Sequence, residues 1–159
     1  GYPAEQVRAQ VGQALELFGL NALAQANPRD LGYSGRKRIA LASTVAMQTP
    51  TLVFDEPTAG LDANEQEQLS RVIFLLGQQG KTILVISHDM DFLAENFDRF
   101  VLLRAGQVVL DANLPQFFSQ TETLEACGLV APQMVRLSQA LGRESLAATV
   151  EQFVGGNMR

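Results

Sequence analysis

Two adjacent carboxylates, Asp55 and Glu56, stand directly after a short apolar run, residues 51–54. Ionised carboxylates are costly to bury without partners, so this pair is expected at a solvated edge of a sheet or facing a cation. In open α/β sheets, ligands bind at the carboxyl ends of the strands. The pair therefore marks a candidate cation site, although two solvated acids at the end of a strand would give the same pattern.

The single histidine, His88, follows a second apolar run, residues 82–86. It takes the same place relative to its strand as the two carboxylates do, so it is expected at the same edge of a parallel sheet. Zinc is not expected there, because no second histidine or suitable cysteine is near. On its own, a lone histidine could equally be an incidental polar residue.

A glycine- and serine-containing turn, residues 31–35, opens a helix and is the third candidate site. The free N–H groups and the dipole of a helix N-terminus favour an anion. The next three residues, 36–38, are all basic. Considered alone, this stretch is also consistent with an ordinary capped helix whose basic first turn faces solvent. The residues of the turn after Leu31 are Gly32, Tyr33, Ser34 and Gly35.

The residues after the carboxylates predict how the chain leaves the first strand. Pro57 lacks an N–H and stops the strand ladder, Gly60 allows a sharp turn, and Asp62 can cap the following helix. That helix carries one apolar stripe and is expected to end at Gly77 and Gly80. The stripe consists of Leu69, Val72, Ile73 and Leu76.

Periodicity and turn composition predict the remaining elements. An amphipathic helix is expected over residues 3–18 and a short helix over residues 90–96. The runs 100–103 and 107–110 flank an Arg-Ala-Gly turn and predict an antiparallel hairpin. A last helix is expected from Glu144 to Val154. The stripe of the first helix is Val7, Val11, Leu15 and Phe18.

Composition excludes several classes of protein. The 159 residues are one domain's worth of chain, and 47% hydrophobic with 18% charged residues is typical of a globular protein. The net charge of -5 argues against holding nucleic acid by bulk electrostatics. A single cysteine, Cys127, excludes an internal disulfide, and no apolar run is long enough to span a membrane. Any work at a membrane is therefore expected to go through a partner.

The string Asp-Glu-Pro-Thr-Ala-Gly-Leu-Asp, residues 55–62, resembles the Walker B motif and D-loop of the ATP-binding cassette ATPases. The context Val-Ile-Ser-His-Asp at 85–89 resembles their switch, or H-loop. The resemblance implies that Asp55 holds Mg²⁺ largely through water and that Glu56 polarises the attacking water. It also implies that His88 contacts the γ-phosphate.

The 31–35 turn occupies the place of this family's Leu-Ser-Gly-Gly-Gln signature, and the match is imperfect. Gly32 stands where the family has serine, and Gly35 where it has glutamine. Tyr33 and Ser34 stand where it has glycines. The resemblance implies that these four residues, together with Asp62 of the D-loop, face nucleotide.

Residues 114–142 resemble the C-terminal extension of energy-coupling-factor ATPases, which drive uptake of vitamins, cobalt and nickel. The implied fold class is α/β: a phosphate-loop NTPase-type fragment with parallel core strands covered by helices. Part of a helical subdomain with the signature region is expected at 1–49 and the core half at 50–112. A C-terminal extension is expected at 113–159, and the hairpin leads into its helices.

No match to the phosphate-loop pattern Gly-x-x-x-x-Gly-Lys-Ser/Thr occurs in the chain. The stretch Gly80-Lys81-Thr82 is not one, because Leu75 stands where that motif needs glycine and the stretch enters a strand rather than a helix. The resemblance therefore covers the second half of an ATPase domain. We expect this chain alone to be inactive, to bind neither ATP nor Mg²⁺ tightly, and to self-associate through an uncovered sheet.

The function implied for the complete domain is ATP hydrolysis that drives import through a membrane transporter. The implied partners are a second ATPase domain, paired head to tail as a homo- or heterodimer, and a transmembrane transport subunit. The implied location is cytoplasmic, on the inner face of the cell membrane. Alternatives are another cassette ATPase, such as an exporter or a soluble member, and a catalytically silent module that pairs with a complete ATPase.

Overall fold

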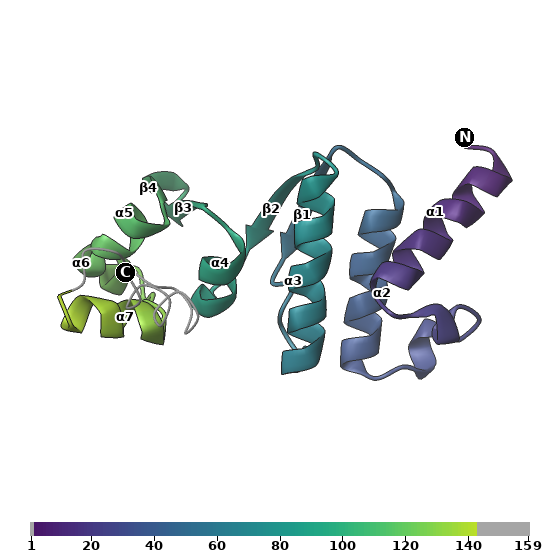
Figure 1. Ribbon diagram of the computed structural model, residues 1–159, viewed down its shortest axis with the longest axis horizontal. Coiled ribbons are helices and arrows are strands. Elements are labelled where there is room, and N and C mark those ends of the chain that lie inside the picture. Colours follow the sequence, from purple (N-terminus) through teal and green to yellow (C-terminus); the bar gives the residue numbers. More distant parts are fainter. Residues whose placement is uncertain (1, 143–159) are drawn as a thin grey trace, which may run out of the picture. The chain divides into compact units, whose positions relative to one another are not determined.

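A computed structural model describes residues 2–142, and the helix expected from Glu144 to Val154 lies outside this range. The chain divides into two compact units, residues 1–87 and 88–159. The first unit contains α1 (Ala4–Leu17), η1 (Asn21–Leu23), η2 (Pro28–Asp30), α2 (Tyr33–Ala46), β1 (Thr51–Asp55), α3 (Ala63–Gln78) and β2 (Thr82–Ile86). The second unit contains α4 (Met90–Asn96), β3 (Arg99–Arg104), β4 (Gln107–Asn113), α5 (Leu114–Ser119), α6 (Thr121–Ala126) and α7 (Gln133–Ala140) (Figure 1).

Strands β1 and β2 form a parallel pair, as the sequence predicts. Their register places Asp55 level with Ile86, so the residues that follow the two strands leave from the same edge. Helix α3 contacts β2 and helix α2 contacts β1. The motif residues at the two strand ends are thereby held by a small α/β layer.

One face of the two-stranded sheet is buried and the other is open. Leu52 and Phe54 are buried, whereas Val53, Leu84 and Ile86 on the other face are 51–53% exposed. Side chains alternate between the faces of a strand, and the described part of the chain covers only the face that Leu52 and Phe54 occupy. The expected uncovered apolar face is therefore present in this structure.

Helix α3 has the predicted apolar stripe, and all four stripe residues are buried. It ends at Gln78, between the two glycines, Gly77 and Gly80, that are predicted to end it. The left-handed residue that stops it is Gly80, with φ +77°. In α1, only the C-terminal part of the predicted stripe is buried: Phe18 just beyond the helix is 2% exposed, while Val7 and Val11 are each 43% exposed.

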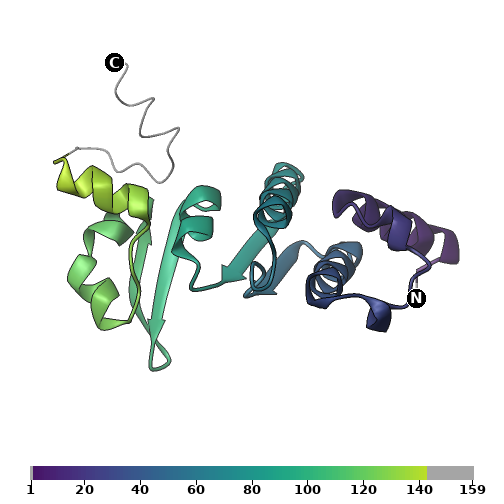
Figure 2. The ribbon, with the colours of Figure 1, turned by 90° about the horizontal axis from the view of Figure 1, so that it is seen from below.

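The second unit is built on the predicted hairpin, which is longer than the apolar runs alone indicate. Its two turn residues, Ala105 and Gly106, both have positive φ, the requirement of a type I′ turn. Helices α5, α6 and α7 lie beside the hairpin (Figure 2). Each of them contributes buried residues to the core of this unit. At its centre lie Phe100, Phe117 and Phe118, whose ring centroids are 5.0–5.5 Å apart. Among the described residues, no helix combines the length and hydrophobicity needed to cross a bilayer.

Candidate functional site

Glu56 is fixed in an unusual backbone conformation at the end of β1. Its φ is +45°, a region that residues other than glycine seldom adopt and that often marks functional positions. Its backbone N–H donates to the carbonyl of Ile86 at 2.8 Å. The Ser87 hydroxyl donates to its Oε2 at 3.1 Å. Both bonds come from the end of β2, so the predicted edge holds this carboxylate in place.

Asp55 lies one residue before Glu56, as the exposed last residue of β1. A single exposed carboxylate suits Mg²⁺, which binds oxygen ligands and keeps several of its waters. No cluster of three or more His, Cys, Asp or Glu side chains suited to a metal ion occurs within residues 2–142. The donor set therefore fits a cation held by one protein carboxylate and water, and the assignment of Asp55 stays a prediction.

The chain then makes a tight turn over residues 57–62. Leu61 N–H donates to the carbonyl of Thr58 at 3.0 Å, and Gly60 has φ +77°. Asp62 caps α3, as predicted, by accepting from the N–H of Glu65 at 2.9 Å. Glu65 in return accepts from the N–H of Asp62 at 3.1 Å, which completes a capping box.

The 31–35 turn lies against the 57–62 turn. Gly32 is the N-cap of α2 and the helix begins at Tyr33, so residues 33–35 form the first turn of α2 and not the separate turn before it that the sequence predicts. The Tyr33 ring is so close to Gly60 that a Cβ built on Gly60 would lie 2.3 Å from Cε1 of the ring. The Ser34 hydroxyl donates to Oε1 of Glu65. The structure thus brings together two segments that the sequence identified separately.

The basic residues after the 31–35 turn also bind this region instead of simply facing solvent. Lys37 Nζ donates to the carbonyl of Asp55 at 3.4 Å. Arg38 forms an ion pair with Glu65 at 3.3 Å and donates to the carbonyl of Phe18. Sequence reasoning missed Arg38 and Glu65 as parts of the site. The Asp-x-x-Glu spacing at 62–65, a capping-box pattern, is the signal that could have identified Glu65.

His88 belongs to the second unit, where it is exposed and precedes the N-cap of α4. That N-cap is Asp89, whose Oδ1 accepts from the N–H of Phe92 at 3.1 Å. The structure therefore brings Glu56 and Ser87 together within the first unit. The approach of His88 to Glu56 stays a prediction.

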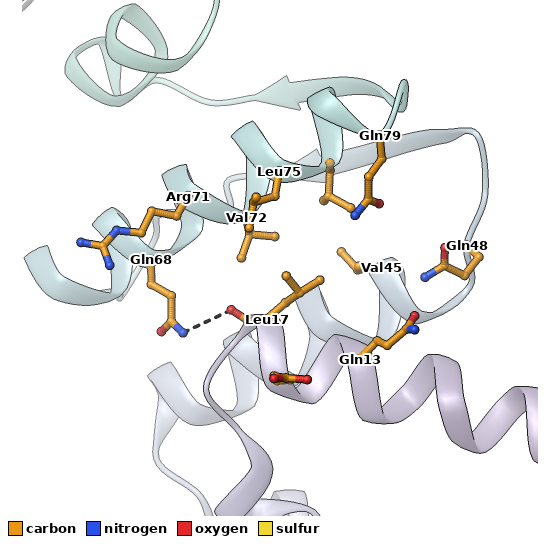
Figure 3. Close-up of a pocket in the computed structure, with 11 residues that line it drawn as sticks. Gln13, Leu17, Val45, Gln48, Gln68, Arg71, Val72, Leu75 and Gln79 are labelled. Carbon is orange, nitrogen blue, oxygen red and sulfur yellow. Dashed lines mark hydrogen bonds between the residues drawn. The ribbon is translucent and has the colours of Figure 1, made fainter.

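A separate pocket of about 550 Å³ lies between α1, the end of α2 and α3 (Figure 3). Its walls combine the apolar side chains of Val45 and Val72 with amide side chains such as Gln13 and Gln79. Gln68 crosses toward α1 and donates to the carbonyl of Leu17 at 3.3 Å. The predicted site residues do not line this pocket, so the candidate site is the edge formed by the 31–35 turn, the 57–62 turn and the strand ends.

Comparisons with known proteins agree with the resemblance that the sequence motifs show. No protein-family model matches the chain. It is 34% identical over 156 residues to the energy-coupling factor transporter ATP-binding protein EcfA2 of Clostridium perfringens, covering 96% of this chain and 55% of that protein. The structure of cbiO1 from Clostridium perfringens, part of the ABC transporter complex cbiONQ, superposes with a TM-score of 0.65 at 26% identity. That match covers 89% of this chain and 56% of cbiO1.

A dimeric post-hydrolysis structure of the ATP-binding cassette MJ0796, bound to ADP and Pi, superposes with a TM-score of 0.63 at 26% identity. That match covers 72% of this chain and 50% of the cassette. The chain thus spans about half the length of the relatives that it matches.

Proposed function

This chain belongs to the ATP-binding cassette (ABC) ATPases, and we propose that it forms the Walker B, signature and H-loop part of an ATPase domain that powers import. The proposed transporter is of the energy-coupling-factor type. Support comes from the names of its relatives, an energy-coupling factor ATP-binding protein and a component of the cbiONQ complex.

Glu56 is the residue that we assign to water activation. The observation that carries this assignment is its left-handed backbone, held by bonds from Ile86 and Ser87 at the carboxyl edge of β1 and β2. A carboxylate fixed before substrate arrives can accept a proton or a hydrogen bond from water without reorganising in the transition state. Free rotation of the same side chain would lose that advantage.

Asp55 and His88 complete the proposed catalytic set. Asp55 would hold Mg²⁺ through its exposed carboxylate, and the ion would neutralise charge on the phosphates when it binds with the nucleotide. His88, one residue after the serine that orients Glu56, would contact the γ-phosphate. Its imidazole can donate a hydrogen bond there in either tautomer.

The 31–35 turn is proposed to act in the site of a second ATPase domain paired head to tail with this one. The dimeric cassette that superposes on this chain supports such pairing. Gly32 offers no hydroxyl to a phosphate, Gly35 offers no amide, and Tyr33 adds bulk where a backbone would need to approach closely. We therefore assign this turn to a weakened half-site, with Gly32, Tyr33, Ser34, Gly35 and Asp62 facing nucleotide.

The proposed place of work is the cytoplasmic face of the cell membrane, on a transmembrane transport subunit. The test is to express the complete ATPase domain with a membrane transport subunit encoded beside it and to measure nucleotide-dependent uptake in vesicles. Uptake of a vitamin or a transition metal into the vesicles that requires Mg-ATP on the side of the ATPase domain supports the proposal. If the domain binds a complete ATPase but hydrolyses no ATP itself, it is a silent interaction module. Transport in the outward direction would indicate an exporter.

A further inference from the structure

We propose that Glu65 is a positioning residue that locks the 31–35 turn to the 57–62 turn, so that the two turns move as one body. This inference rests on the proposed function, because it concerns the two turns that would face nucleotide. It assigns a role to a side chain outside the resemblance to known motifs.

Both oxygens of Glu65 are engaged. Oε1 accepts from the Ser34 hydroxyl and from Arg38 Nη1, the latter at 3.3 Å. Oε2 accepts from the N–H of Asp62 at 3.1 Å. The side chains of Glu65 and Arg38 are only 17% and 20% exposed, so solvent screens their ion pair less than it would on an open surface. Glu65 thus connects the first turns of two helices through charge-assisted hydrogen bonds.

A second contact joins the same two turns. The Tyr33 ring covers Gly60, leaving no room for a side chain there. The 31–35 turn is therefore held at two points of the 57–62 turn: by Tyr33 at Gly60, and by Ser34 through Glu65 to the capping residue Asp62. A displacement of either turn must carry the other with it or break these contacts.

The bond to Glu65 also determines what Ser34 can do. A hydroxyl has one proton to donate, and that of Ser34 is donated to a carboxylate. Ser34 therefore cannot give the same proton to a phosphate while the bridge is intact, and it does not replace the missing signature serine at position 32. Its role is to tie the 31–35 turn to Glu65 through this hydrogen bond.

The bridge can be tested by backbone hydrogen exchange in the complete ATPase domain, because each turn has a reporting amide. Arg36 N–H donates to the carbonyl of Gly32 at 3.1 Å, and Leu61 N–H donates to that of Thr58 at 3.0 Å. Ser34→Ala should accelerate exchange at both amides by roughly tenfold, the effect of losing one charge-assisted hydrogen bond. Glu65→Gln should do the same, because an amide offers one accepting oxygen where the carboxylate uses two.

Two variants serve as controls. Ser34→Thr keeps the hydroxyl and should restore wild-type exchange at both amides. Glu67→Gln changes an exposed glutamate of the same helix, which pairs with Arg71, and should leave both amides unchanged. Acceleration at Arg36 alone in the Ser34→Ala protein would show that the turns are not coupled and would overturn the proposal.

Turnover separates positioning from simple stabilisation. Ser34→Ala and Glu65→Gln should lower kcat by roughly tenfold with an unchanged KM for ATP, and the double variant should lose little more than either alone. An unchanged kcat in an active enzyme whose amides exchange faster would overturn the positioning role. If the wild-type domain hydrolyses no ATP, the proposed function fails, and the exchange at Leu61 still decides whether Glu65 couples the two turns.

Discussion

Ser87 donates its hydroxyl proton to Oε2 of Glu56 at 3.1 Å, and so connects the ends of the two parallel strands through a side chain as well as through the backbone. Glu56 N–H makes the backbone connection by donating to Ile86. Together the two bonds hold the main chain and the carboxylate of Glu56 at once. The role proposed for Glu56, which is to orient a water molecule, would benefit from both restraints.

Replacing Ser87 tests the value of the side-chain restraint. In the complete ATPase domain, Ser87→Ala should lower kcat by roughly tenfold while leaving KM for ATP unchanged, because Glu56 keeps its charge and loses one orienting bond. Steady-state kinetics measure this directly. Ser43→Ala is a matched control, because Ser43 bonds only within α2. Equal turnover in the Ser87 and Ser43 variants would remove Ser87 from the account.

Gly60 should tolerate no side chain, for two separable reasons. Gly60→Ala places a Cβ at a left-handed position, which costs about 1–2 kcal/mol in the free energy of unfolding, and also drives it into the Tyr33 ring. Urea unfolding should show a loss larger than the backbone cost alone. Adding Tyr33→Ala should recover the part caused by the clash. Gly77→Ala, at an open helix position, should instead stabilise by about 0.5–1 kcal/mol. No recovery in the double variant would mean that the ring moves aside freely.

Gly32→Ser should restore a hydroxyl to the 31–35 turn without disturbing the Ser34–Glu65 bridge. A Cβ on Gly32 meets no atom within 4 Å, and serine is a good N-cap residue. The ATPase rate per site should rise, and the free energy of unfolding should stay equal or increase. Kinetics of the assembled dimer provide the measurement. A rate that stays level or falls while the variant remains folded would mean that the present turn already works fully.

The raised pKa of Glu95 should make the stability of the second unit depend on pH. The partial burial of this otherwise exposed carboxyl, followed by the charges of Asp91 and Asp89, raises its pKa above the ordinary value of 4.5. Because the pKa is raised in the folded state, the contribution of protonated Glu95 to the free energy of unfolding is complete below the unfolded-state pKa. This contribution is lost as the pH rises through the folded-state pKa. Glu95→Gln should therefore raise Tm at pH 7, and the difference should shrink toward pH 4.5. A gain that is the same at both pH values would assign the effect to packing.

Much of the fold could be predicted from local pattern. The four-residue stripe of α3 and the cap at Asp62 follow from helical spacing and from a side chain that can accept backbone N–H groups. The hairpin followed from two apolar runs about a glycine-containing turn. The open face of the sheet, with Val53 and Leu84 half exposed, could not be predicted from the strand sequences, because burial depends on what packs against a strand.

The site was predictable to the level of motifs but not of contacts. Spacing identified Glu56 and the 31–35 turn, yet the bonds of Ser34 and Arg38 to Glu65 join residues 31 and 27 positions apart, respectively. Such pairs depend on how α2 lies against α3, which no local pattern encodes. The left-handed backbone of Glu56 was likewise hidden, since nothing in a glutamate indicates positive φ.

The central claim is that Glu56 activates water in an ATP-hydrolysing domain, and Glu56→Gln in the complete domain tests it most directly. The substitution keeps the shape of the side chain and removes its charge. Single-turnover hydrolysis of Mg-ATP should fall by on the order of 100-fold or more, several kcal/mol of barrier, while the Kd for the nucleotide stays within about threefold of wild type. Hydrolysis within about threefold of wild type, with binding intact, would contradict the account and move the search for the base to Asp89.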